Sequence, residues 1–227
     1  MITVKKDAIK IKTSDGMQNS GVICQIGTFG TDWFKYVNTL SKVFQNAAFQ
    51  ENTNLVFDMP NFGIVDTNSH MYYAFCGTTG LTSIKLSCND NGFSRSHAFA
   101  FANSPDLKII DLTDWKCGIL HAQSIFQNCE KLEAVKGVLT LTNNAVLTNA
   151  FYKCYALKEV RFTPNCIFEK CEITSPLLSD KSVQSIIDAL GDLTGTTSKT
   201  VQFNTDVKAK LTENQIAQIT SKNWTLA

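Results

Sequence analysis

A phenylalanine followed six residues later by a leucine recurs along the middle of the chain. Clear copies begin at Phe75, Phe101, Phe126 and Phe151, and a weaker copy begins at Phe49. Successive phenylalanines in this series are 26, 26, 25 and 25 residues apart. A repeat of this length indicates structural units that are each too small to bury their own apolar face and must stack on their neighbours.

A short apolar run follows most of the leucines and predicts a β-strand, because apolar and polar positions alternate in it. The predicted strands cover residues 81–86, 107–112, 132–136 and 157–162. Residues 89–92 and 143–144 are typical of turns. An irregular or short helical return then carries the phenylalanine towards the next strand. The pattern therefore predicts a solenoid with phenylalanine and leucine ladders inside it.

The pattern changes before residue 40. Residues 8–12 alternate strictly, residues 14–16 predict a turn, and residues 21–26 predict a second strand, which together give a β-hairpin. Residues 32–37 predict a short helix that closes the first coil. Since a hairpin of this size needs a surface to pack on, it either caps the solenoid or docks onto another subunit.

The C-terminal part alternates helix and strand. Ser179 predicts the N-cap of a helix that has Gly191 as its stop, and residues 200–203 predict a strand. Thr212 and Gln215 form a capping box that opens a second helix. The side chains expected to face the core from the two helices are Val183, Ile186, Ile187, Leu190, Ile216 and Ile219. These elements predict one more coil and a cap over the open end of the solenoid.

The repeat Phe-x-x-Cys-x-x-Leu-x-x-Ile/Leu-x-Leu resembles the BspA-like leucine-rich repeat of bacterial surface proteins and of phage or prophage proteins. Residues 126–132 and 151–157 match it best, and residues 107–113 carry its strand pattern. Asn52, Thr78 and Ser104 stand at the cysteine position in other copies.

The resemblance implies an α/β leucine-rich-repeat solenoid of about five coils. We expect the repeats over residues 33–178, an N-terminal hairpin for capping or attachment over residues 1–32, and a strand-helix cap over residues 179–227. The segment around residues 207–225 also resembles the ends of predicted phage and prophage proteins of gut bacteria.

Composition narrows the function classes. The chain has 227 residues, of which 44% are hydrophobic, so it is long enough for a sizeable core. Its net charge of +1 excludes nucleic-acid binding driven by bulk charge. No apolar run approaches the roughly 20 residues of a membrane-spanning helix. Residues 1–8 lack the apolar stretch of a secretory signal, so we expect synthesis and folding in the bacterial cytoplasm.

The cysteines and histidines offer little chemistry. The eight cysteines include no Cys-x-x-Cys pair, so we expect buried thiols and no zinc site. His70, His97 and His121 precede the repeat phenylalanines by five, four and five residues, but no fixed carboxylate accompanies them. An enzyme that pairs His121 with Cys117 or Cys129 is the lowest-ranked hypothesis. We expect no metal and no cofactor.

The strand face that points away from the core is the natural recognition surface. Its charges are of both signs, which argues against a polyanionic ligand. Exposed aromatic side chains favour protein or sugar contacts, and the alternative for each is simple packing. The predicted binding residues are Lys85, Asp111, Lys136, Glu159 and Arg161 on the strand face, and Tyr72, Tyr73 and Trp115 as exposed aromatics.

Three hypotheses follow. The first is a non-enzymatic structural or host-recognition component of a phage or prophage particle. Its N-terminal segment would bind other virion subunits, its face would bind a host surface protein or glycan, and particle symmetry would make it a homo-oligomer. The second is a bacterial cell-surface adhesin. The third is the Cys/His enzyme.

Overall fold

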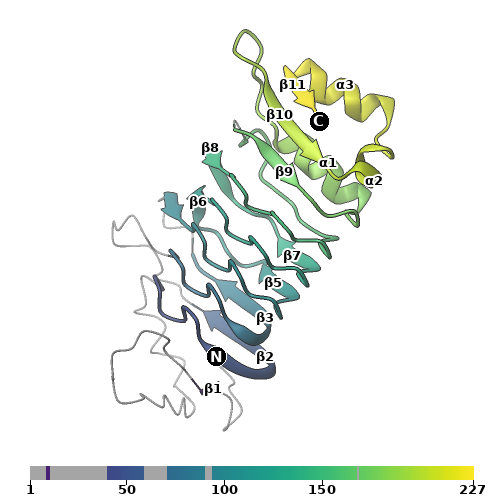
Figure 1. The fold of residues 1–227 in the computed structure, drawn as a ribbon. Helices are drawn as coiled ribbons and strands as arrows, with labels where there is room; N and C mark the ends of the chain where they lie inside the picture. Colours follow the sequence, from purple (N-terminus) through teal and green to yellow (C-terminus); the bar gives the residue numbers. More distant parts are fainter. Residues whose placement is uncertain (1–8, 11–39, 59–70, 90–93, 168) are drawn as a thin grey trace.

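The computed structural model describes residues 9–10, 40–58, 71–89, 94–167 and 169–227. Figure 1 shows an elongated stack of coils in the N-terminal and middle parts, with the helices gathered at the C-terminal end. One continuous hydrophobic core extends from Leu40 to Trp224. The fold is therefore a solenoid-like α/β fold, as the repeat predicted. The expected hairpin and the helix over residues 32–37 lie outside the described residues, apart from residues 9 and 10.

The first face of the solenoid is a five-stranded sheet. Its order is β1 (Ile9–Lys10), β2 (Ala48–Asp58), β3 (Thr79–Ser87), β5 (Ile109–Leu112) and β7 (Ala134–Gly137). Strands β2, β3, β5 and β7 are parallel, and β1 pairs antiparallel with β2 at the edge. The predicted strand over residues 157–162 continues this face only as bridges from Ala134 to Glu159 and from Leu139 to Phe162.

A second parallel sheet occupies the next side of each coil. It consists of β4 (Ser94–Ser96), β6 (Gly118–His121) and β8 (Leu141–Val146). The sequence did not predict these strands, and the prediction of a turn at residues 143–144 is wrong, because both asparagines lie inside β8. The segments around Phe75, Phe101 and Phe126 that follow are irregular turns, as predicted. The pairing of these short strands with neighbouring coils satisfies backbone groups that would be orphaned in an irregular segment.

The third side of the coil is a turn with two left-handed residues. The two sets are Lys42, Tyr73, Phe99, Ser124 and Asn149, followed four residues later in each coil by Asn46, Gly77, Asn103, Asn128 and Lys153. Backbone N–H groups of the turn donate to carbonyl oxygens of the next coil, as in the 2.7 Å bond from Phe75 to Ala100. The turn is therefore joined along the solenoid axis much as a strand would be.

The phenylalanine ladder lies inside these turns and is confirmed from Phe75 to Phe151. Ring centroids are 5.5 Å apart between Phe75 and Phe101, 5.7 Å between Phe101 and Phe126, and 5.4 Å between Phe126 and Phe151. The assignment of Phe49 to the ladder is wrong. Phe44 stacks on Phe75 at 5.0 Å, and its N–H donates to Ala74 just as that of Phe75 donates to Ala100. Irregular register within β2 accommodates the longer first interval.

The C-terminal part forms a three-stranded parallel sheet with helices beside it. Its elements are β9 (Cys171–Ile173), α1 (Asp180–Ala189), β10 (Lys199–Phe203), α2 (Thr205–Lys208), α3 (Glu213–Ser221) and β11 (Trp224–Leu226). The N-cap at Ser179, the apolar stripe of α1 and the capping box of Thr212 and Gln215 are confirmed. Helix α1 ends at Ala189 with Leu190 as its C-cap, so Gly191 follows directly as the predicted stop. Ile216 is 39% exposed, so the prediction that it faces the core is wrong.

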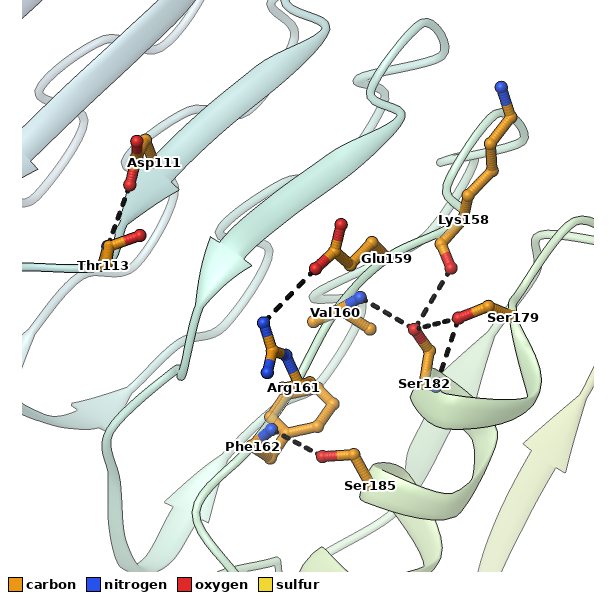
Figure 2. A network of polar contacts seen from close by, with 10 residues as sticks. All are labelled: Asp111, Thr113, Lys158, Glu159, Val160, Arg161, Phe162, Ser179, Ser182 and Ser185. Atoms are coloured by element: carbon orange, nitrogen blue, oxygen red, sulfur yellow. Dashed lines mark hydrogen bonds and ion pairs between the residues drawn. The ribbon is translucent and has the colours of Figure 1, made fainter.

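Helix α1 closes the first face of the solenoid (Figure 2). The Val160 N–H donates to Ser182 Oγ at 3.1 Å, and the Phe162 N–H donates to Ser185 Oγ at 3.0 Å. Ser182 Oγ in turn donates to the Lys158 carbonyl. The serines thus replace the strand that would otherwise follow, and they protect an open edge from pairing with another chain. Within the described residues, no helix has the length and apolarity needed to cross a bilayer.

Candidate binding surface

The strand face presents two parallel rows of outward side chains, because successive coils pair in register. One row joins Asn54, Ser83, Ile109, Ala134 and Glu159. The other joins Val56, Lys85, Asp111 and Lys136. The intervening residues, such as Ile84, Ile110 and Val135, are buried. The alternation that predicted the outward positions is therefore confirmed in these strands, and neighbouring positions of a row lie about 4.8 Å apart.

Charges of both signs lie along the second row. Lys85 Nζ is 2.8 Å from a carboxylate oxygen of Asp114, and this hydrogen bond and charge raise the pKa of Lys85. Partial burial opposes ionisation of Asp111, but the hydrogen bonds from Thr113, with the charges of Lys85 and Lys136, lower its pKa overall. Lys85, Asp111 and Lys136 thus follow one another on adjacent strands, so the sign of the charge alternates along this part of the row.

Glu159 and Arg161 lie at the C-terminal end of the face, beside α1 (Figure 2). Their side chains form an ion pair of 3.4 Å, and both are about half exposed. An exposed pair of this kind contributes at most about 1 kcal/mol to stability. Both groups are therefore available to exchange this contact for one with a partner.

A hollow that the sequence did not predict lies beside the second row. It has a volume of about 420 Å³ and is lined by Lys85, Ser87, Cys88, Asn89, Asp114 and Lys116. Residues 114 and 116 flank an inward tryptophan, so the alternation around Trp115 contains the signal that would have placed both of them outward.

The three aromatic side chains that the sequence predicted as exposed differ in their burial. Tyr72 and Tyr73 are half-buried and contact each other edge-on at 4.5 Å, and Tyr73 stacks on Phe99 at 4.8 Å. Lys42 lies 5.9 Å from the Tyr72 ring centre. These rings reach the surface of the turn side, away from the strand face. The prediction that Trp115 is exposed is wrong: it is 3% exposed and meets the His97 ring edge-on at 5.6 Å, because it fills the corner between the two sheets.

The two histidines that the structure describes, His97 and His121, lie in different environments. His97 is buried and His121 is exposed, although the His97 N–H donates to the His121 carbonyl at 2.8 Å. His70 lies outside the described residues. In the part of the chain that the structure describes, no three histidine, cysteine or acidic side chains gather as metal ligands.

Free, buried thiols are found at Cys76, Cys129, Cys154, Cys166 and Cys171. Cys129 Sγ donates to the Phe101 carbonyl at 2.9 Å, and burial raises the pKa of this thiol to about 12. Cys154 makes the same bond to Phe126, and burial raises its pKa as well. A thiol in this setting is protonated at neutral pH and is a poor nucleophile. The cysteine of the repeat therefore lies inside the coil, as the resemblance implied.

The comparisons with known proteins agree with this architecture. Residues 58–174, slightly more than half of the chain, match the model of the BspA type leucine-rich repeat region in six copies. No curated protein and no solved structure matches the chain. Since the number of matched copies differs from the predicted number of about five, the exact count of coils stays a prediction.

Proposed function

Because the chain belongs to the BspA type leucine-rich repeat family, we propose that it is a non-enzymatic recognition module that binds a protein or glycan through its strand face. Leucine-rich repeats of this kind suggest a protein-binding or adhesion role, and the family is typically non-enzymatic. The observation that carries the proposal is the row formed by Lys85, Asp111 and Lys136 on adjacent parallel strands.

The shape and charge of this face suit a macromolecule. The face is built on a rigid sheet, and the hollow beside it is polar and open, whereas small-molecule sites are enclosed and largely apolar. Alternating charges favour specific orientation of a partner with a mixed surface over tight binding of a polyanion.

We place this module in a phage or prophage particle, as a structural or host-recognition component of the tail, baseplate or head. Support comes from the resemblance of the repeats and of the C-terminal segment to phage and prophage proteins. In this proposal residues 1–32 attach the chain to other virion subunits, and the exposed face meets the host surface. A cell-surface adhesin is the alternative, since the same repeats resemble those of bacterial surface proteins.

Binding to intact bacteria tests the recognition face. A Lys85→Glu/Lys136→Glu variant should bind at least tenfold less tightly than the wild type, with an unchanged melting temperature. Lys210→Glu is the matched control, because Lys210 is exposed in the C-terminal part. Equal binding by the face variant and the wild type would refute the proposal. Pretreatment of the cells with protease or with periodate distinguishes a protein partner from a glycan.

Immunogold labelling separates the two settings. An antibody against the chain should label purified particles released from an induced lysogen, and it should not label the surface of intact producing cells. Surface labelling without particle labelling would support the adhesin instead.

A further inference from the structure

Two cysteines of neighbouring coils meet at the corner between the two sheets. Cys88 follows β3, and Cys117 precedes β6. The Cys88 thiol donates to Cys117 Sγ, and the two sulfur atoms are 2.8 Å apart. The Cys117 thiol in turn donates to the Asn89 carbonyl oxygen at 3.4 Å.

The backbone around this pair is held by the repeat itself. Cys88 forms a parallel bridge with Trp115, and its N–H donates to the Asp114 carbonyl at 3.1 Å. Both cysteines are at most 4% exposed. A disulfide has an S–S length of about 2.05 Å, so the sulfur atoms need to approach by only about 0.8 Å.

A small reagent has a route to this pair. Cys88 lines the polar hollow of about 420 Å³ described above, together with Asn89 and Lys116. Three other thiols are directed elsewhere, since Cys129, Cys154 and Cys166 each donate to a backbone carbonyl oxygen.

We propose that Cys88 and Cys117 form an inter-coil disulfide when the folded protein meets a disulfide oxidant of low molecular mass, such as oxidised glutathione. The Cys88 thiolate attacks one sulfur of oxidised glutathione, which forms a mixed disulfide and releases one glutathione thiolate. The Cys117 thiolate then attacks the Cys88 sulfur, forms the Cys88–Cys117 bond and releases the second glutathione. Two protein thiols are oxidised, one glutathione disulfide is reduced, and two protons appear on the two glutathione molecules.

Whether this disulfide forms depends on the compartment in which the protein lies. In a reducing cytoplasm the pair stays as thiols, and on a released particle or an outer surface it is oxidised. Closure of a loop between residues 29 apart restricts the unfolded chain and raises the melting temperature of a domain of this size by roughly 5 °C or more.

Oxidation of the purified, reduced full-length chain tests the proposal. After incubation with oxidised glutathione, denaturation and alkylation with iodoacetamide, we expect two alkylated thiols fewer per chain. Proteolysis without reductant should yield one peptide that contains both Cys88 and Cys117, and the melting temperature should rise. Dithiothreitol should reverse all three changes.

Variants separate this bond from other oxidation. Cys88→Ser and Cys117→Ser should each abolish the cross-linked peptide and the rise in melting temperature, whereas Cys129→Ser should retain both. A stable glutathione adduct on Cys88 without closure, a cross-link that maps to other cysteines, or unchanged thiols would overturn the proposal. Because these readouts also use the wild-type protein, they hold even if a serine variant folds poorly.

Discussion

The thiol of Cys154 donates a 3.0 Å hydrogen bond to the carbonyl oxygen of Phe126, one coil earlier. Cys129 makes the same bond to Phe101, and Ser104 makes it to Phe75. The cysteine position of the repeat is therefore a buried donor that links each coil to the one before it. A hydroxyl serves equally well, which explains why serine stands at this position in one copy.

We predict that Cys154→Ser changes the free energy of unfolding little, because the donor is retained. Cys154→Val keeps the volume but removes the donor, and it should lower the free energy of unfolding by about 1 kcal/mol. The loss stays modest because the Phe126 carbonyl also accepts from the Cys129 N–H. Urea denaturation monitored by circular dichroism measures the difference, and equal stability of the two variants would contradict a hydrogen-bonding role.

The stacked rings support a second prediction. Phe101 is 2% exposed and lies between Phe75 and Phe126. Phe101→Ala should cost about 3–5 kcal/mol, because it removes a buried ring and leaves a cavity that two rigid neighbouring coils cannot close. Tyr152→Ala, at a 39% exposed position in the turn of a later coil, should cost less than about 1 kcal/mol. Thermal or urea unfolding measures the loss in the free energy of unfolding for both variants. A similar loss at the two sites would show that the phenylalanine ladder does not stabilise the fold.

Acid should weaken the contact between Asp106 and the preceding coil. The Gly80 N–H donates to one Asp106 oxygen at 2.9 Å, Lys131 donates to the other at 3.0 Å, and these bonds lower the pKa of Asp106 below its ordinary value of 3.8. Because the pKa of Asp106 is lower in the folded protein than in the unfolded chain, its carboxylate stabilises the fold at a pH above the unfolded-state pKa. This stability is lost as the pH falls through the folded-state pKa. The effect is below about 1 kcal/mol, because the carboxylate is partly exposed to solvent.

Asp106→Asn isolates this effect. Wild type should exceed the variant in free energy of unfolding at pH 6, and the gap should narrow between pH 5 and pH 3. Lys131→Met retains the bond from Gly80, the larger cause of the shift, so it should keep most of the pH dependence. A gap that does not change with pH would mean that the carboxylate contributes through shape alone.

The sequence predicted two kinds of feature: strands in which apolar and polar residues alternate, and coils that the phenylalanine repeat defines. The inward residues Ile84, Ile110 and Val160 are buried, and the ladder from Phe75 onwards was located from spacing alone. The sequence predicted Phe49 as the first phenylalanine of the ladder, whereas Phe44 takes that place in the structure. Irregular pairing within β2 separates Phe44 from its strand by an unusual number of residues, so the spacing of the later copies does not locate it. A single sequence contains no direct sign of such an irregularity.

Other features depend on contacts between coils and were less visible. Strands of three or four residues, such as β4 and β6, are too short to show a period. The sequence predicts Trp115, just after the strand over residues 107–112, as an exposed aromatic, yet tertiary packing gives it the corner beside His97. The hollow near Lys85 requires two coils, so no local pattern predicts it.

Glycine geometry supports the last prediction. Gly137 has φ of +86° at the end of β7, and an added Cβ would lie 2.7 Å from backbone atoms of Leu112, at the end of β5, and of Thr113, which follows it. Gly195 has a similar φ of +78°, but an added Cβ would meet nothing within 4 Å. Gly195→Ala should therefore lose only the roughly 1 kcal/mol of left-handed backbone strain.

Gly137→Ala carries the same strain and also forces β5 and β7 apart, since backbone atoms cannot rotate away as a side chain does. We expect a loss on the order of 3 kcal/mol in the free energy of unfolding, measured by urea denaturation of both variants. The difference between the two alanine variants isolates the close approach of neighbouring coils. If both lost the same amount, left-handed geometry alone would account for the glycine, and the packing of β7 on β5 would be looser than the structure shows.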